Sequence, residues 1–255
     1  MAIVIALVVA VLSGCAGETP DARPSPVREW RTEVVATYPH DGKAFTQGLE
    51  LRDGMLYEGT GRYGSSWITV SDFPSGTVRE RVDLEPELFG EGITLVGDTI
   101  WQLTWRNGVA LLRDRASLSE IRRVRYQGEG WGICYQSGEN RLVMSDGTNR
   151  LSFRDPESFR AVGSVAVTLR GRPLSRLNEL ECVGDSVWAN VYGRNELVRI
   201  DPDSGEVTDV VRVPMVHREG VLNGIAAIPG TDELLITGKN WPTMYRVRLA
   251  RGFTT

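Results

Sequence analysis

The sequence predicts an all-β protein, a five-bladed β-propeller with four-stranded antiparallel blades that is closed by its own N-terminal strand. Three observations predict it: a short motif that returns five times, short β-type runs joined by turns between its copies, and a run without a partner before the first copy. Repeats of 40 to 47 residues, as found here, are typical of propellers. The 255-residue chain, 41% hydrophobic and 24% charged, is long and apolar enough to bury a sizeable core.

The recurring motif is a polar or aromatic residue, then Gly or Glu, then an apolar residue, as in QGL at 47–49 and EGI at 91–93. Aligning its copies gives one column with spacings of 44, 40, 47 and 45 residues: Gln47, Glu91, Trp131, Asn178 and Asn223. The first strand of a propeller blade lines the central channel, so we expect this column around one end of it. Polar groups beside aromatic ones suit a small-ligand site, but a channel can also be polar simply because it holds water.

Each repeat contains four β-type runs. QGLEL at 47–51 is followed by a turn, RDG, and a second run, MLYEGTG, which predicts a hairpin. A third run ends at a shared turn such as RDPESF at 154–159, where Asp accepts backbone N–H groups and Pro pre-sets φ for a type I turn. A fourth run follows the equivalent turn of each repeat, such as TVRERVDL at 77–84 in the first repeat. This is the composition of a four-stranded propeller blade.

The fifth repeat ends after three runs, near the C-terminus. WRTEVVATYP at 30–39 is a spare run at the other end of the chain, and we expect it to supply the missing outer strand. Closure in this way leaves no unpaired edge, which removes an aggregation hazard. Residues 30–255 are therefore predicted to form one propeller domain, and a closed ring with few exposed edges favours a monomer.

Residues 1–29 are predicted to be a leader and a flexible tether. The apolar run at 1–17 is short for a membrane span and ends in small residues, as a secretory signal does. LSGC at 12–15 resembles the bacterial lipobox, in which the cysteine, here Cys15, is lipidated. No Lys or Arg precedes the run, so either the true start lies upstream or the signal is atypical. An ordinary cleaved signal with an incidental cysteine is the alternative to lipidation. We expect an exported protein, held at the outer face of the bacterial cell membrane by Cys15 alone or secreted.

Export implies an oxidising compartment, in which Cys134 and Cys182 either form a disulfide or remain two buried thiols. The net charge is only -4 and the Lys and Arg residues are scattered, so no nucleic-acid partner is expected. There are two His residues and no Cys-x-x-Cys pair, which excludes a multi-His metal site. A calcium-dependent propeller hydrolase built on carboxylates and Asn remains open.

Glu91 is a candidate for proton transfer. A carboxyl group among Phe and Trp side chains on an inner strand is costly to ionise, so its pKa should be raised. That is a typical condition of a group that shuttles protons.

Several ordered motifs carry a resemblance over about residues 30 to 250. YPHDGKAFTQGLEL, LYEGTGRYGSSW, LFGEGIT, GEGWGICY, LNELE, VWANVY and GKNWP together resemble the metal-free glutaminyl-peptide cyclotransferases, the glutamine cyclotransferase family of plants and bacteria. The resemblance implies a five-bladed propeller with its site at the channel mouth and no cofactor. It also implies peptide or protein substrates whose N-terminal Gln is converted to pyroglutamate with release of ammonia.

By the same resemblance, Glu91 is the acid and base, and Gln47, Asn178 and Lys239 orient the substrate and stabilise charge on its oxygen. An aromatic wall would grip the glutaminyl stem: Phe45, Phe89, Trp105, Trp131 and Trp188. Two other classes remain as alternatives, a catalytically silent binding propeller and a metal-dependent hydrolase such as a lactonase.

Overall fold

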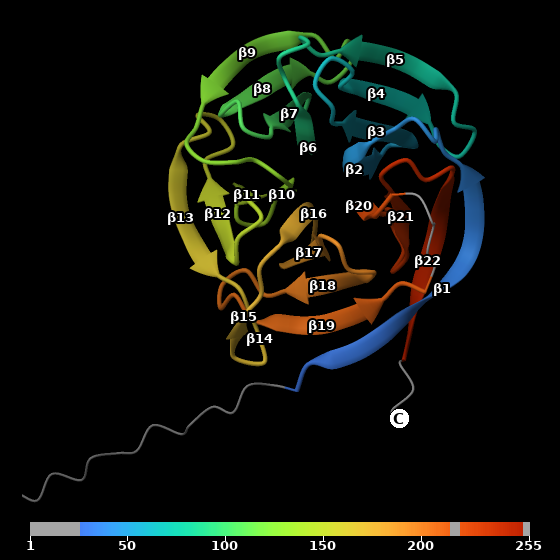
Figure 1. Cartoon of the computed structure of the whole chain (residues 1–255), viewed down its shortest axis with the longest axis vertical. Helices are drawn as coiled ribbons and strands as arrows, with labels where there is room; N and C mark the ends of the chain where they lie inside the picture. Colours follow the sequence, from blue (N-terminus) through green and yellow to red (C-terminus); the bar gives the residue numbers. More distant parts are fainter. Residues whose placement is uncertain (1–25, 215–219, 252–255) are drawn as a thin grey trace, which may run out of the picture.

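The computed structural model describes residues 26–214 and 220–251, which form 22 strands and no helix. Three sheets contain four antiparallel strands each, one contains eight, and a two-stranded hairpin completes the set. Figure 1 shows these sheets arranged around a common centre. The all-β class is as predicted, whereas Cys15 and most of the predicted leader lie outside the described residues.

The three four-stranded sheets follow one another along the chain. The first is β2 (Thr46–Arg52), β3 (Met55–Thr60), β4 (Trp67–Asp72) and β5 (Val78–Asp83). The second is β6 (Gly90–Val96), β7 (Thr99–Thr104), β8 (Val109–Asp114) and β9 (Glu120–Arg125). The third is β10 (Ile133–Gln136), β11 (Arg141–Ser145), β12 (Arg150–Arg154) and β13 (Ala161–Ala166).

The eight-stranded sheet consists of two four-stranded halves. One half is β16 (Leu177–Val183), β17 (Ser186–Val191), β18 (Glu196–Ile200) and β19 (Val207–Arg212). The other is β1 (Arg28–Pro39), β22 (Thr243–Arg251), β21 (Leu234–Gly238) and β20 (Leu222–Ala227). The hairpin is β14 (Thr168–Leu169) with β15 (Arg172–Pro173).

Strand β1 is the partner that the last repeat lacks. It pairs antiparallel with β22 from Trp30 to Pro39, as predicted. It also begins two residues earlier than predicted, at Arg28, and its first residues pair parallel with β19. The Arg28 guanidinium and the Trp30 indole both donate to the Asp209 carboxylate on β19, at 2.8 and 2.6 Å. These contacts join the outer strands of the two halves into one sheet, which the sequence did not predict.

The first strands of the five four-stranded units contact one another in a closed circle, β2 with β6, then β10, β16, β20 and back to β2. They approach closely because the residue after the motif column is glycine in four units. A Cβ atom on Gly92 would lie 2.8 Å from Cα of Gly132, closer than packed atoms tolerate. In the remaining unit this position holds Glu179, which is buried at the centre.

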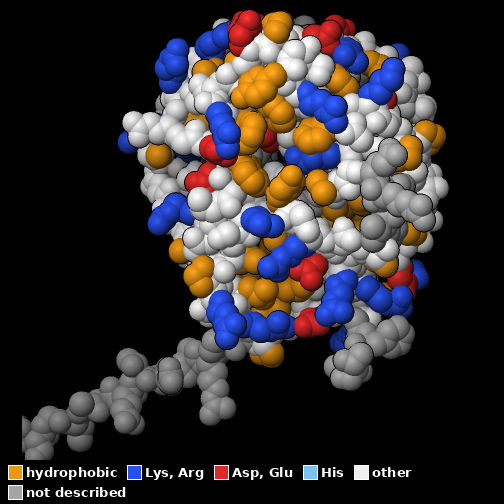
Figure 2. Space-filling model, in the orientation of Figure 1, with side chains coloured by type: hydrophobic (Ala, Val, Ile, Leu, Met, Phe, Trp, Pro, Cys, Tyr) orange, Lys and Arg blue, Asp and Glu red, His pale blue; other side chains and the backbone are white. Residues whose placement is uncertain are grey.

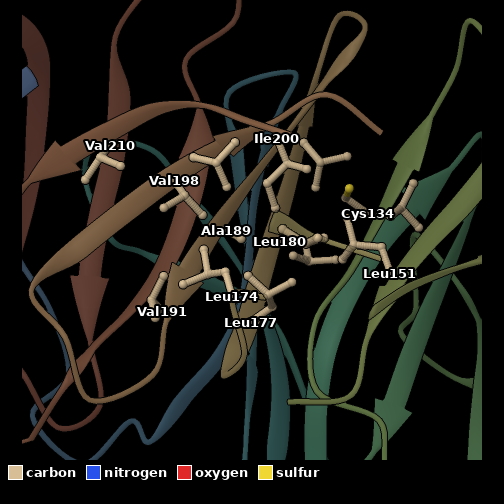
Figure 3. Packing of buried hydrophobic residues seen from close by; sticks show 14 of the residues in the cluster. Cys134, Leu151, Leu174, Leu177, Leu180, Ala189, Val191, Val198, Ile200 and Val210 are labelled. Atoms are coloured by element: carbon tan, nitrogen blue, oxygen red, sulfur yellow. The ribbon is translucent and has the colours of Figure 1, made fainter. Parts of the chain in front are cut away.

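Apolar side chains fill the spaces between neighbouring units. Figure 3 shows the cluster between the third sheet and β16–β19, with Leu151 on one side and Leu180 and Ile200 on the other. Cys134 on β10 and Cys182 on β16 form a disulfide across the same interface, with Cα atoms 5.4 Å apart. Of the two alternatives left open for these cysteines, the bridged one is found.

The charged side chains form no stripe on the face shown in Figure 2. Lys and Arg side chains lie interspersed with acidic and hydrophobic ones across it. Among the described residues, no helix is long and apolar enough to cross a membrane.

Candidate active site

A pocket of about 310 Å³ lies where the motif column ends. It brings together eight of the nine predicted site side chains and adds Tyr192; its lining consists of Phe45, Gln47, Phe89, Glu91, Trp105, Trp131, Asn178, Tyr192 and Lys239. Ligand pockets are typically concave and mostly apolar with a few convergent polar groups, and this pocket has that character.

Strand irregularities aim the column residues at the pocket. The pairing register shifts between Thr46 and Gly48, on either side of Gln47, and between Gly90 and Ile93, where Glu91 lies. Bulges of this kind turn a side chain away from the regular alternation of a strand and are frequent next to active sites. The repeat therefore places polar side chains at one end of the inner strands.

Glu91 is 5% exposed, and its Oε2 atom has no hydrogen-bond partner among the described residues. Burial raises the pKa of this carboxyl well above its ordinary value, the Lys239 cation opposes the rise, and the Glu129 carboxylate adds to it. The prediction of a raised pKa agrees with this environment. An unpartnered buried carboxyl oxygen facing an open pocket is available to a substrate N–H group.

Lys239 directly follows β21 and lines the same pocket as Glu91. Its Nζ atom donates to Oε1 of Gln47 at 2.6 Å and lies 4.7 Å from the centre of the Phe45 ring. Burial lowers the pKa of Lys239 to about 8, although the Glu91 carboxylate raises it. The lysine is therefore a cation at neutral pH whose charge is lost in mildly alkaline solution.

Asn178 offers a second open acceptor. It is 2% exposed, and its Oδ1 atom has no hydrogen-bond partner among the described residues. Its main-chain oxygen accepts from the Ser145 hydroxyl at 2.6 Å, which fixes the backbone at this point. Buried polar groups are normally hydrogen-bonded, so an open acceptor in a pocket marks a place where a ligand donor can bind.

The aromatic wall is held by a carboxylate that the sequence reasoning missed. Oε2 of Glu129 accepts from the indole N–H groups of Trp105 at 2.8 Å and Trp131 at 2.9 Å, and Oε1 accepts from Arg106 at 2.8 Å. Burial would raise the pKa of Glu129, but these hydrogen bonds lower it below its ordinary value. Glu129 is therefore an anion that fixes two walls of the pocket. Its position two residues before the motif column in GEGWG was the available signal.

Trp188 is a correction to the prediction, because it lies in the core. It is 6% exposed and belongs to the apolar cluster that includes Leu197 and Trp241. Its place in the repeat is that of Trp101, which is also buried in the core, whereas Tyr192 has the place of Trp105. Extending the repeat alignment beyond the first strand would have identified Tyr192.

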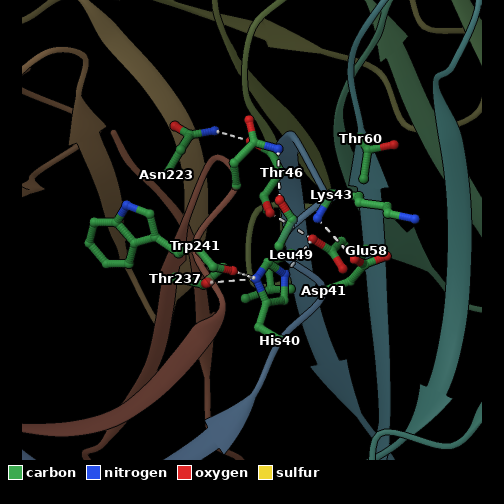
Figure 4. Close-up of polar contacts among 12 residues, drawn as sticks. His40, Asp41, Lys43, Thr46, Leu49, Glu58, Thr60, Asn223, Thr237 and Trp241 are labelled. Atoms are coloured by element: carbon green, nitrogen blue, oxygen red, sulfur yellow. Dashed lines mark hydrogen bonds and ion pairs between the residues drawn. The ribbon is translucent and has the colours of Figure 1, made fainter. Parts of the chain in front are cut away.

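A polar network lies where β1 ends, next to the strand that carries Gln47 (Figure 4). Oε1 of Glu58 accepts from the Thr46 hydroxyl at 2.7 Å and lies 2.9 Å from Nε2 of His40. The other ring nitrogen of His40 lies 2.6 Å from the main-chain oxygen of Trp241. Thr46 precedes Gln47, so the network fixes the strand that carries one of the site residues.

A larger cavity, of about 620 Å³, is lined by Glu50 and Glu181 among others. Their carboxylates already accept backbone N–H groups, from Leu95 at 2.8 Å and Ala227 at 2.7 Å respectively. Among residues 26–214 and 220–251, no group of three or more His, Cys, Asp or Glu side chains is placed to hold a metal ion. Open acceptors beside a cation distinguish the smaller pocket as the candidate active site.

Residues 5–249 match the family model described as glutamine cyclotransferase. The chain belongs to the glutamine cyclotransferase family. It is 34% identical over 228 residues to an Arabidopsis thaliana protein named glutaminyl-peptide cyclotransferase, a match that covers 85% of this chain and 71% of the plant protein.

Solved structures agree with the membership in the glutamine cyclotransferase family. The crystal structure of Myxococcus xanthus glutaminyl cyclase is similar with a TM-score of 0.82 and 34% identity, and the match covers 89% of this chain and all of that one. Hydrazine synthase of Kuenenia stuttgartiensis matches with a TM-score of 0.51 at 15% identity, over 85% of this chain and 65% of that one, which shows a likeness of fold alone.

Proposed function

We propose that the protein is a glutaminyl-peptide cyclotransferase in which Glu91 shuttles the proton. It converts the N-terminal Gln of peptides and proteins to pyroglutamate and releases ammonia. The observation that carries the proposal is the buried Glu91 carboxyl, with an unpartnered oxygen in an aromatic pocket that also holds the Lys239 cation. Membership in the glutamine cyclotransferase family supports it and does not favour a silent binding module or a metal-dependent hydrolase.

The reaction needs a base and then an acid at one place. The α-amine nitrogen attacks the carbon of the side-chain carboxamide, a C–N bond forms, and Glu91 takes a proton from the amine. Glu91 then returns that proton to the side-chain nitrogen, the old C–N bond breaks, and ammonia leaves. A carboxyl group with a raised pKa suits both steps. The attacking amine has an ordinary pKa of about 7.7 to 8, so part of it is neutral at neutral pH.

Polar neighbours of Glu91 supply orientation and charge. Lys239 stabilises the negative charge that develops on the carboxamide oxygen, and Gln47 holds the ammonium in place. The open Oδ1 atom of Asn178 accepts an N–H group of the substrate. A preorganised donor such as the Lys239 ammonium is typically worth about 100- to 1,000-fold in turnover.

The aromatic walls hold the glutaminyl stem and exclude water. Phe89 packs against Trp105 with ring centres 5.3 Å apart, and Trp131 meets Tyr192 at 5.8 Å. Water exclusion strengthens the attraction between the Lys239 cation and the charge that develops beside it. It also favours attack by the internal amine over attack by solvent.

The proposal extends to the architecture and the location of the protein. The closed circle of inner strands supports a five-bladed propeller at residues 30–255, with the eight-stranded sheet counted as two blades joined at their outer strands. The small-residue motif ending in Cys15 supports export with a lipid anchor, and a tether up to residue 29. Closure of the ring by β1 supports a monomer.

Activity on a Gln-initiated peptide tests the function. We follow the ammonia that is released and the loss of one ammonia from the mass of the peptide, with chelator present throughout to remove metal ions. We expect turnover in the native protein and a loss of about 100- to 10,000-fold in Glu91→Gln, since a general acid and base contributes that much. The same change at the exposed Glu139 is the matched control and should leave turnover unchanged.

Each alternative predicts another result. A binding propeller shows no turnover above the spontaneous rate, and Glu91→Gln leaves its ligand bound. A metal-dependent hydrolase loses activity in chelator. Either outcome from well-folded protein would overturn the assignment.

A further inference from the structure

A second groove adjoins the candidate active site. Its volume is about 520 Å³, and its lining includes Lys43, Phe45, Arg62, Trp67 and Arg81. Phe45 also lines the active-site pocket, so the two spaces adjoin the same residue. A peptide whose first residue occupies the pocket can therefore continue into the groove.

Two further contacts place the groove directly beside the pocket. Gly61 lines the groove, and a Cβ atom at this position would lie 2.8 Å from Nε2 of Gln47 in the pocket. Asn240 lines the groove directly after Lys239, and its Oδ1 atom accepts from Arg62 at 2.7 Å. Gly61 and Asn240 of the groove are therefore neighbours of Gln47 and Lys239 of the pocket.

The groove is basic. Three basic side chains line it against one acidic side chain, Asp41. Arg81 is paired with Asp83 at 2.8 Å, but neither Lys43 nor Arg62 forms an ion pair among the described residues. Arg62 lies over the Phe45 ring at 4.7 Å, which holds its charge beside the entrance to the pocket.

The rim of the pocket beside Trp105 is balanced in charge. Arg106 lies over the Trp105 ring at 4.0 Å, and its guanidinium is paired with Glu129 at 2.8 Å. A negatively charged side chain that leaves the pocket is therefore attracted to the Lys43 and Arg62 side more than to the Arg106 side. Both rims are exposed, so the attraction is modest and screened by salt.

We propose that this groove binds the residues that follow the N-terminal Gln and favours substrates with Asp or Glu at the second or third position. The inference rests on the proposed cyclotransferase function and names its preferred substrate class. Extended residues advance by about 3.3 to 3.6 Å each, so the second and third side chains of a peptide that leaves the pocket past Phe45 come within reach of Arg62 and Lys43.

Matched peptides test the preference. Peptides with Glu, Gln or Lys at the second position, and a second set varied at the third, are compared by kcat/KM at low and at physiological salt. Exposed ion pairs contribute little individually, so we expect Glu peptides to exceed Gln peptides by about three- to tenfold, and the ratio to shrink as salt rises. Lys43→Gln and Arg62→Gln should each reduce the ratio. Arg150→Gln, an exposed change on β12, is the matched control and should leave it intact.

The possible results separate the inference from the function beneath it. Equal kcat/KM for Glu and Gln peptides at both positions overturns the inference while turnover of the neutral peptides upholds the cyclotransferase. A ratio that survives Lys43→Gln and Arg62→Gln overturns it too, and its loss in Arg106→Gln would show that the peptide leaves by the rim beside Trp105. No turnover of any peptide overturns the proposed function itself.

Discussion

At the scale of single residues, the pocket couples two groups that burial pushes in opposite directions. Burial raises the pKa of the Glu91 carboxyl and lowers the pKa of the Lys239 ammonium, because each charged form loses water. The positive charge of Lys239 favours the ionised form of Glu91, and the negative charge of Glu91 favours the ionised form of Lys239. The pair therefore sets a pH window in which Glu91 can exchange a proton while Lys239 remains charged.

The alkaline limit of activity should come from Lys239. Its pKa of about 8 means that the cation is present below that pH and lost above it. The neutral fraction of the substrate amine rises over the same range, so kcat/KM should rise to about pH 8 and fall beyond it. In Lys239→Gln we expect turnover lower by about 100-fold and no fall above pH 8. A fall that persists in the variant would assign the alkaline limit to another group.

Glu129 should act as a positioning residue for the aromatic wall and for Glu91. Its negative charge raises the pKa of Glu91, so Glu129→Gln should move the acid limb of the kcat profile to lower pH. Weaker bonds to Trp105 and Trp131 should lower kcat/KM by about tenfold, because hydrogen bonds to a charged group are worth more than neutral ones.

The control for Glu129→Gln is Glu85→Gln, which removes an exposed carboxylate bound to Arg123 away from the pocket. It should change neither the acid limb nor kcat/KM. An acid limb that stays in place in Glu129→Gln, or moves to higher pH, would show that Glu91 does not respond to this charge.

At the scale of strands, the repeat predicted what depends on position along the chain. Gln47 and Glu91 could be placed together at one end of the inner strands, because equivalent positions on inner strands converge wherever units are arranged around a centre. Trp188 could not be separated from a pocket residue by its type alone, since aromatic side chains serve core and site equally. The bridge between Cys134 and Cys182 was equally undecidable, because it depends on how close β10 and β16 come in space.

The disulfide should stabilise the fold without serving the reaction. It closes a loop across a sequence separation of 48 residues and joins two neighbouring inner strands. Its reduction should lower the free energy of unfolding by about 2 to 4 kcal/mol, measured by urea denaturation with and without reductant. Turnover should persist, because neither cysteine lines the pocket. A Cys134→Ala, Cys182→Ala double variant is the control and should not respond to reductant; an equal response would mean that the reductant acts elsewhere.

At the scale of the whole molecule, one carboxyl group binds three units together at the centre. Glu179 on β16 accepts from the backbone N–H of Leu49 on β2 at 3.3 Å and of Ile225 on β20 at 2.9 Å. The other four units have glycine at this position, which lets their strands approach. Glu179 is thus the one side chain at this position, and it bonds to two neighbouring inner strands. That side chain is 1% exposed, so its ionisation state bears on the stability of the whole ring.

Glu179 should make the protein less stable as pH rises. Burial raises its pKa well above the ordinary value, the Glu181 carboxylate raises it further, and the backbone hydrogen bonds oppose the rise. In the unfolded chain the group ionises above about pH 4.3, whereas in the folded ring it stays neutral to a higher pH. The stability that the neutral form provides is therefore fully present below pH 4.3 and is lost as pH rises to the folded pKa.

The glutamine side chain of Glu179→Gln cannot ionise. As pH rises, the free energy of unfolding of the native protein should therefore fall relative to that of the variant, by up to about 1.4 kcal/mol per pH unit. Urea denaturation of both proteins between pH 5 and pH 7 measures the difference, with Glu139→Gln, an exposed change, as the baseline. A difference that stays constant or grows in favour of the native protein would mean that Glu179 is an anion in the folded ring. The centre would then be held by charged hydrogen bonds to two neighbouring strands, and the variant would lose stability at every pH above the ordinary pKa of the group.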